Sequence, residues 1–298
     1  MAPIFMLLLA GQALAQEVPL FRADVAQVRL DVQVVDAKGR TVKGLTRDDF
    51  AVFDEDQPSE IVAFGLDTEP LDLLLLLDVS GSMRRQVQQL AQSARDALDE
   101  LRDDDEVALM LFARHSEVVH GFTPDLGRVQ QDLRQALRWT GLGAGTLLNA
   151  ALLAGVEVMR EREPRGRRAV LCVTDNQGLN YQSPDEAVIQ AYLAADTVLN
   201  AIVTGSARPP DPSANPDFTA FDVFTIAEQT GGEALSASDA GKVFPELIER
   251  IRSRYSLALR AGTGEAGNFR RVRVLLAGPA SQKYPGARVR ARSGYTLQ

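Results

Sequence analysis

Two stretches of the chain are almost continuously apolar, residues 71–77 and residues 169–174, and each runs into an aspartate, Asp78 and Asp175. Continuous apolar runs of this length are typical of strands that are buried on both faces, as in a parallel sheet covered by helices. Elsewhere in residues 69–253, apolar residues recur at helical spacing, so that strand and helix patterns alternate. This alternation predicts an α/β domain with a doubly wound, mostly parallel sheet flanked by helices.

The two ends of the chain follow a different period. Residues 28–34 alternate apolar and polar positions, and the same two-residue period returns from Tyr255 onward. We therefore expect β regions at residues 16–68 and 254–298. Because a few isolated strands are only marginally stable, we expect the two regions to pair into one small β-sandwich, with the α/β domain inserted between them.

A group of oxygen-bearing side chains follows the first apolar run: Asp78, Ser80 and Ser82. Open α/β folds bind their ligands at the carboxyl edge of the sheet, which is where this group is expected to lie. One carboxylate and two hydroxyls suit a hard divalent cation such as Mg²⁺ or Ca²⁺. The alternative is that Asp78 ends the strand and the two serines cap the helix that follows.

Two further side chains are expected at the same edge. Thr146 ends the glycine-rich segment 140–146 and precedes a stretch with helical spacing, so its hydroxyl lies at a loop-to-helix junction. Asp175 ends the second apolar run and places a carboxylate at another strand tip. Two strand ends and one loop would then supply five oxygen ligands.

In this order, the five side chains resemble the metal-ion-dependent adhesion site of von Willebrand factor type A domains. That family carries Asp-x-Ser-x-Ser after its first strand, a Thr on a later loop and an Asp after its fourth strand. The resemblance covers roughly residues 69–253. It implies a divalent cation, with Mg²⁺ first and Ca²⁺ or Mn²⁺ as alternatives, held by Asp78, Ser80, Ser82, Thr146 and Asp175.

The flanks extend the resemblance over most of the chain. Residues 44–50 read GLTRDDF and residues 292–295 read RSGY, which is similar to a bacterial exported subfamily of proteins related to these domains. One departure is Asn176, where many relatives have Gly. Asn tolerates left-handed backbone angles better than most residues, so we expect the turn to be preserved.

The resemblance implies a metal-dependent protein-binding module, for adhesion or envelope assembly, rather than an enzyme. In the family the metal commonly binds an Asp or Glu side chain of a partner protein, and such a contact combines a charged docking point with loops that set specificity. A second possibility is a structural scaffold that binds its partner through the β flanks. A third is a metal-dependent hydrolase.

Motifs for three enzyme classes are incomplete. Gly145 is not followed by the Lys of a phosphate-binding loop, and Ser80 stands where a haloacid dehalogenase phosphatase has its second carboxylate. The two histidines, His115 and His120, have no sequence context that directs them toward Ser80 or Ser82. We therefore expect no catalytic activity.

The first 15 residues are typical of an export signal, because residues 4–10 are apolar and Ala13-Leu14-Ala15 is a small-residue cleavage pattern. We therefore expect a secreted or periplasmic protein. No other stretch reaches the length of a membrane-spanning helix. The net charge of −8 disfavours binding to nucleic acid and to anionic membranes, which would repel the chain.

Overall fold

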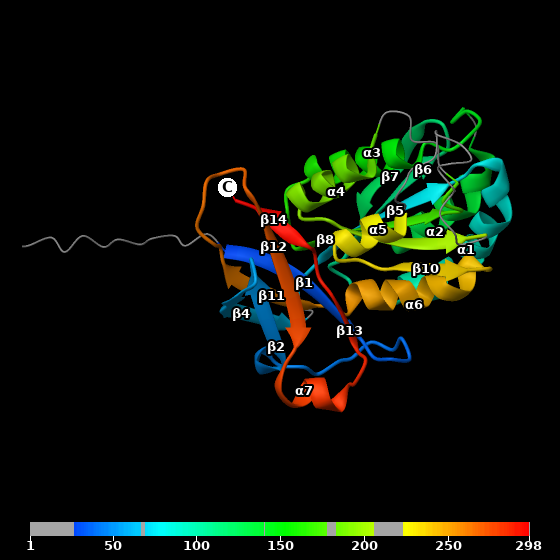
Figure 1. Ribbon diagram of the computed structural model, residues 1–298. Coiled ribbons are helices and arrows are strands. Elements are labelled where there is room, and N and C mark those ends of the chain that lie inside the picture. The colour runs from blue at the N-terminus through cyan, green and yellow to red at the C-terminus, as the bar shows by residue number, and fades with distance from the viewer. Residues whose placement is uncertain (1–26, 67–68, 140, 178–182, 206–222, 298) are drawn as a thin grey trace, which may run out of the picture.

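The α/β part and the β part of the chain lie side by side in the computed structural model (Figure 1). The predicted signal segment, residues 1–15, falls outside the described residues. The structure describes residues 27–66, 69–139, 141–177, 183–205 and 223–297.

A six-stranded sheet forms the centre of the α/β part, in the order β10-β9-β8-β5-β6-β7. All neighbouring strands are parallel except β7, which pairs antiparallel with β6 at one edge. The expected α/β fold is therefore confirmed. The strands are β5 (Leu71–Asp78), β6 (Glu106–Phe112), β7 (Ser116–Thr123), β8 (Arg167–Thr174), β9 (Val198–Thr204) and β10 (Ala234–Ala237).

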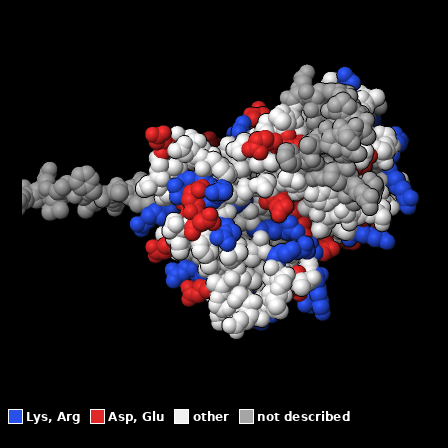
Figure 2. Space-filling model, in the orientation of Figure 1, with Lys and Arg blue, Asp and Glu red and all other residues white. Residues whose placement is uncertain are grey.

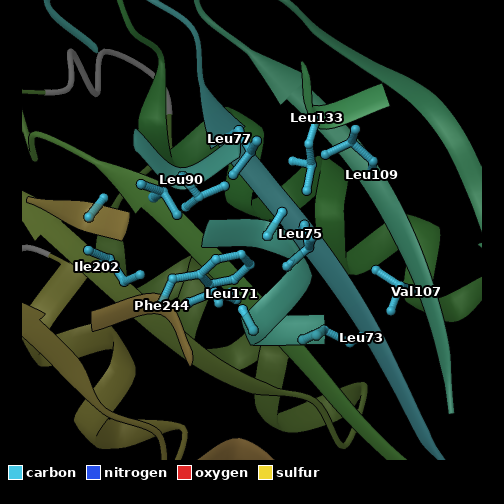
Figure 3. Close-up of a cluster of buried hydrophobic side chains, with 14 of the residues drawn as sticks. Leu73, Leu75, Leu77, Leu90, Val107, Leu109, Leu133, Leu171, Ile202 and Phe244 are labelled. Atoms are coloured by element: carbon cyan, nitrogen blue, oxygen red, sulfur yellow. The ribbon is translucent and has the colours of Figure 1, made fainter. Parts of the chain in front are cut away.

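Helices cover both faces of this sheet, which explains why β5 is apolar at nearly every position. Leu73, Leu75 and Leu77 face one layer of helices, and Leu74 and Leu76 face the other. Figure 3 shows the first cluster, where the side chains of β5 meet those of α1, α2 and α6. The helices are α1 (Arg84–Leu98), α2 (Leu126–Gln135) and α6 (Ala240–Arg252) on that face, and α3 (Leu148–Arg160), α4 (Asp185–Ala194) and α5 (Val223–Gln229) on the other.

Strands from both ends of the chain pair with one another, as expected. β1 pairs with β11 and β12 pairs with β2, which gives two four-stranded sheets in the orders β13-β1-β11-β4 and β14-β12-β2-β3. Side chains of both sheets share one core. The strands are β1 (Gln27–Val35), β2 (Phe50–Asp54), β3 (Gln57–Ser59), β4 (Ile61–Leu66), β11 (Tyr255–Arg260), β12 (Phe269–Leu276), β13 (Arg288–Arg290) and β14 (Gly294–Thr296).

The C-terminal region is not all β, which corrects the sequence-based expectation. A short helix, α7 (Gly278–Lys283), connects β12 to β13, and it has Pro in its first turn. Pro is favoured there because its missing N–H has no helical partner in any case. The division of the chain at residues 69 and 253 stays a prediction.

A buried ionic cluster joins the two parts. Glu233 precedes β10 and is 1% exposed. Its carboxylate accepts hydrogen bonds from Arg250 of α6 at 2.8 Å, Arg290 of β13 at 3.2 Å and Gln33 of β1 at 3.5 Å. A buried carboxylate is stable only when paired in this way, so Glu233 links the β flank to the α/β part.

Candidate metal centre

Asp78 is the last residue of β5, and its side chain is fully buried. One carboxylate oxygen, Oδ1, accepts the backbone N–H of Ser80 at 2.9 Å. The other, Oδ2, accepts the hydroxyl of Thr174, the last residue of the neighbouring strand β8, at 3.1 Å. These two bonds fix the orientation of the carboxylate at the carboxyl edge of the sheet.

The two serines and Asp175 lie in the same cluster. The hydroxyl oxygens of Ser80 and Ser82 are 3.3 Å apart, and the hydroxyl of Ser82 donates to Oδ2 of Asp175 at 2.7 Å. Ser82 is exposed and Asp175 is half-buried, so the cluster opens to solvent above Asp78. The structure thus brings together four of the five predicted side chains.

Helix capping does not account for the two serines. Ser80 precedes a single 3₁₀ turn, η2 (Gly81–Met83), and its side chain makes no capping hydrogen bond. The residue that precedes α1 is Met83 rather than a serine. The two hydroxyls instead meet each other, and that of Ser82 also donates to Asp175.

Thr146 is held at the same edge by its backbone neighbours. Leu147 donates its N–H to the carbonyl of Ala113, and Val79 donates to the carbonyl of Phe112, each at 2.9 Å, so both segments are attached to the end of β6. Thr146 is 7% exposed. Within the described part of the chain, no hydrogen bond joins Thr146 to the other four side chains.

Two further residues support the site: Asn176, at the turn expected after Asp175, and Thr174, which the sequence patterns did not single out. Asn176 has a left-handed backbone, with φ of 57°, which agrees with the expected turn. Its N–H donates to the hydroxyl of Thr174 at 3.1 Å, and its side-chain oxygen accepts the N–H of Val223 at the start of α5. The available signal for Thr174 was a hydroxyl residue at the end of an otherwise apolar strand.

The charge of Asp78 is unfavourable in the absence of a cation. Burial raises its pKa to about 6, and the nearby negative charge of Asp175 adds to the effect, whereas the hydrogen bonds from Ser80 and Thr174 oppose it. Within the described residues, neither Asp78 nor Asp175 forms an ion pair with Lys or Arg. An uncompensated carboxylate beside hydroxyls is a donor set that fits a hard divalent cation.

The composition of the cluster also bears on the kind of metal. No group of three or more His, Cys, Asp or Glu side chains suited to a metal occurs in the residues that the structure describes. The cluster instead combines two carboxylates with hydroxyl groups. Oxygen donors of this kind favour Mg²⁺, Ca²⁺ or Mn²⁺ over metals that select thiolate or imidazole ligands.

Comparison with known families agrees with this geometry, because residues 73–177 match the von Willebrand factor type A domain. The chain contains a von Willebrand factor type A domain. The matched segment begins in β5 and ends just after Asp175, so it includes all five predicted site residues. The sequences of curated proteins gave no match.

Three solved structures illustrate the similarity. A von Willebrand factor type A protein from Catenulispora acidiphila is 12% identical, with a TM-score of 0.49, over 93% of this chain and 74% of that one. An aerotolerance-related membrane protein from Bacteroides fragilis is 16% identical, with a TM-score of 0.47, over 61% of this chain and 98% of that one. Proximal thread matrix protein 1 of the mussel byssus, with a zinc-occupied metal-ion-dependent adhesion site, is 18% identical, with a TM-score of 0.47, over 68% of this chain and 50% of that one.

Within the described residues, no hydrogen bond joins either histidine to Ser80 or Ser82. The ring of His120 on β7 lies 3.6 Å from a carboxylate oxygen of Asp132 on α2. His115 is exposed in the turn between β6 and β7, and its backbone N–H donates to the carbonyl of Leu142.

Among the described helices, none has the length and apolar character needed to cross a membrane.

Proposed function

We propose that this protein is an exported, metal-dependent protein-binding module for adhesion or envelope assembly. The observation that carries the proposal is the buried Asp78 carboxylate, which has no cationic partner among the residues that the structure describes. This carboxylate lies in one hydrogen-bonded cluster with two hydroxyls and a second carboxylate. Mg²⁺ is the preferred cation, with Ca²⁺ and Mn²⁺ as alternatives. The proposed ligands are Asp78, Ser80, Ser82, Thr146 and Asp175.

Each side chain has a distinct role in this proposal. Asp78 supplies negative charge from the base of the site, and Thr174 and the Ser80 amide keep its oxygens oriented. Ser80 and Ser82 supply neutral oxygens, so the two carboxylates, Asp78 and Asp175, are the only proposed ligands that offset the charge of a divalent ion. A bound cation would supply a positively charged docking point for an anionic oxygen. We propose that a partner protein provides this oxygen from an Asp or Glu side chain.

The module is proposed to act outside the cytoplasm, as a secreted or periplasmic protein. Residues 1–15 would be the export signal, residues 69–253 the binding domain, and residues 16–68 with 254–298 the β flank that carries it. The match to a family of binding domains and the absence of a histidine beside the serines support a role without catalysis. We infer that turnover is not part of the function.

A structural scaffold is the second candidate, and one feature of the β flank favours it. A groove of about 320 Å³ runs along β2 and β3 and is lined in part by Phe50, Phe53 and Pro58. A partner bound there would not touch the metal edge, by which we mean the carboxyl edge of the sheet that carries Asp78 and Asp175. Asp78→Ala separates the two functions, because partner binding lost with an intact fold supports the metal-dependent module and binding retained supports the scaffold.

Calorimetric titration of the full chain with Mg²⁺, Ca²⁺ and Mn²⁺ tests the proposal. We expect one saturable site, abolished by Asp78→Ala and weakened by Thr146→Ala. Asp99→Ala is a matched control, because Asp99 is an exposed carboxylate at the end of α1. Equal metal binding by the wild type and by Asp78→Ala would overturn the proposed site.

A further inference from the structure

A groove of about 220 Å³ lies between α1 and α2. Its floor is apolar, because the side chains of Val87 and Leu133 are both 1% exposed. Ala91 and Leu137, each half-buried, extend the apolar surface along the two walls. The groove is therefore an apolar surface on one helical face of the α/β domain.

Both walls of this groove lead along the chain toward the candidate metal centre. Val87 follows Ser82 by five residues, which corresponds to about 7–8 Å along a helix axis. The opposite wall ends in the 3₁₀ turn η3 (Ala136–Arg138), which is followed by the glycine-rich segment that carries Thr146. Both walls thus lead into turns of the metal edge, and a ligand lying in the groove would reach that edge with one end.

The rim of the groove is positively charged, although the chain as a whole carries −8. Arg134 lines the groove. Arg84, Arg85 and Arg138 are exposed near its metal-edge end. None of these four arginines forms an ion pair within the residues that the structure describes. Figure 2 shows basic side chains along the edge of the molecule on the side where α1 lies.

We propose that the groove between α1 and α2 docks an acidic segment of the protein partner, continuous with the carboxylate that reaches the metal edge. This inference rests on the proposed function and specifies its partner. An apolar side chain of the segment covers Val87 and Leu133, and acidic side chains meet the unpaired arginines. The charge complementarity favours an acidic segment, because arginines without partners gain most from carboxylates.

Selection from a library of short random peptides, with the full chain immobilised in Mg²⁺, tests the proposal. We expect enriched peptides to contain several Asp or Glu residues together with a Leu, Phe or Trp. Arg134→Glu and Gln88→Trp, which places a large ring over the groove, should each weaken binding of an enriched peptide by about tenfold or more. Arg260→Glu, an exposed charge reversal on β11, is the matched control and should leave the affinity unchanged.

The outcomes separate this inference from the proposed function. Mg²⁺ titration without peptide should be the same in Arg134→Glu, Gln88→Trp and the wild type. If the wild type does not bind Mg²⁺ in this titration, the proposed function is overturned, and the docking proposal falls with it. Two results would overturn only the docking proposal. The enriched peptides could bind in a metal-dependent way but lack acidic residues, or their affinity could be the same for the wild type and both groove variants. A dimer in sedimentation that Gln88→Trp dissociates would assign the groove to a second copy and would also overturn it.

Discussion

The hydroxyl of Thr174 donates a hydrogen bond to Oδ2 of Asp78 at 3.1 Å, across the pair of strands β8 and β5. Both side chains are fully buried. Strand order alone makes this contact possible, since the two residues are 96 positions apart in the sequence. The proposed metal ligand is consequently oriented by the sheet before any ligand binds, and this has consequences that mutation can measure.

Replacing Thr174 by Val should weaken Mg²⁺ binding without unfolding the domain. Val has a similar shape, but it removes a hydrogen bond to a charged group, which is worth about 1.5–3 kcal/mol. We expect the Mg²⁺ affinity measured by calorimetry to fall by about tenfold or more. Thr174→Ser keeps the hydroxyl and should retain most of the affinity. Equal affinities in the Val and Ser variants would show that the bond does not orient Asp78.

Metal binding should weaken as the pH falls through the pKa of Asp78. Burial raises this pKa to about 6, so below that pH a proton must leave the carboxylate before a cation binds. We expect little change in affinity from pH 8 to pH 7, and a loss approaching about tenfold per unit well below pH 6. Calorimetry at pH 5.5 in two buffers of different ionisation enthalpy should detect proton release. Metal binding without proton release at pH 5.5 would contradict the assignment of Asp78 as a metal ligand.

The metal-free protein should gain stability from neutralising Asp78. Its folded-state pKa of about 6 lies above the ordinary value of 3.8, so the native state binds more protons than the unfolded state between these two pH values. The contribution of Asp78 to the free energy of unfolding therefore falls as the pH rises from about 4 to 6.

Asp78→Asn should remove that contribution. With a metal chelator present at pH 7.5, we expect the free energy of unfolding measured by urea denaturation to be higher in the variant than in the wild type, by on the order of 2–3 kcal/mol. This difference should vanish near pH 4. Asp99→Asn, at an exposed position, should show no such pH-dependent difference. If the variant is less stable than the wild type at pH 7.5, the burial of an unfavourable charge at Asp78 is ruled out.

Glu233→Gln should destabilise the whole protein. The substitution deprives the half-buried Arg290 of its carboxylate partner. It also removes one of the two carboxylates that pair with Arg250, whose side chain is 7% exposed and keeps its ion pair with Glu246. Breaking a buried ion pair from one side costs about 3–5 kcal/mol. Urea denaturation should show this loss, whereas Glu228→Gln, at an exposed position of α5, should unfold like the wild type. Coincident midpoints for both variants would mean that the cluster contributes little to stability.

Much of the fold was predictable because local patterns are strong where the chain is buried. The leucines of residues 71–77 exclude an exposed strand, and this fixes a parallel sheet with helices on both faces. The proximity of Asp78 and Asp175 then follows from the common edge at which parallel strands end. The pairing of the two flanks was predictable from the shortage of strands in each.

Contacts between distant segments were not predictable in the same way. Thr174 fits a strand by its own β propensity, so nothing local indicates that its hydroxyl meets Asp78. The bond between Glu233 and Arg290 depends on how the β flank packs against the α/β part. The helix α7 is six residues long, too short for helical periodicity to show, and Pro279 is the one local signal of its start.

Anomalous scattering from crystals of the full chain grown with Mn²⁺ tests the central claim most directly. We expect one strong peak at the carboxyl edge of β5 and β8, about 2–2.5 Å from the hydroxyl oxygens of Ser80 and Ser82. Crystals of Asp78→Ala should lack this peak. A manganese peak elsewhere on the chain, or a peak at this edge that persists in Asp78→Ala, would contradict it.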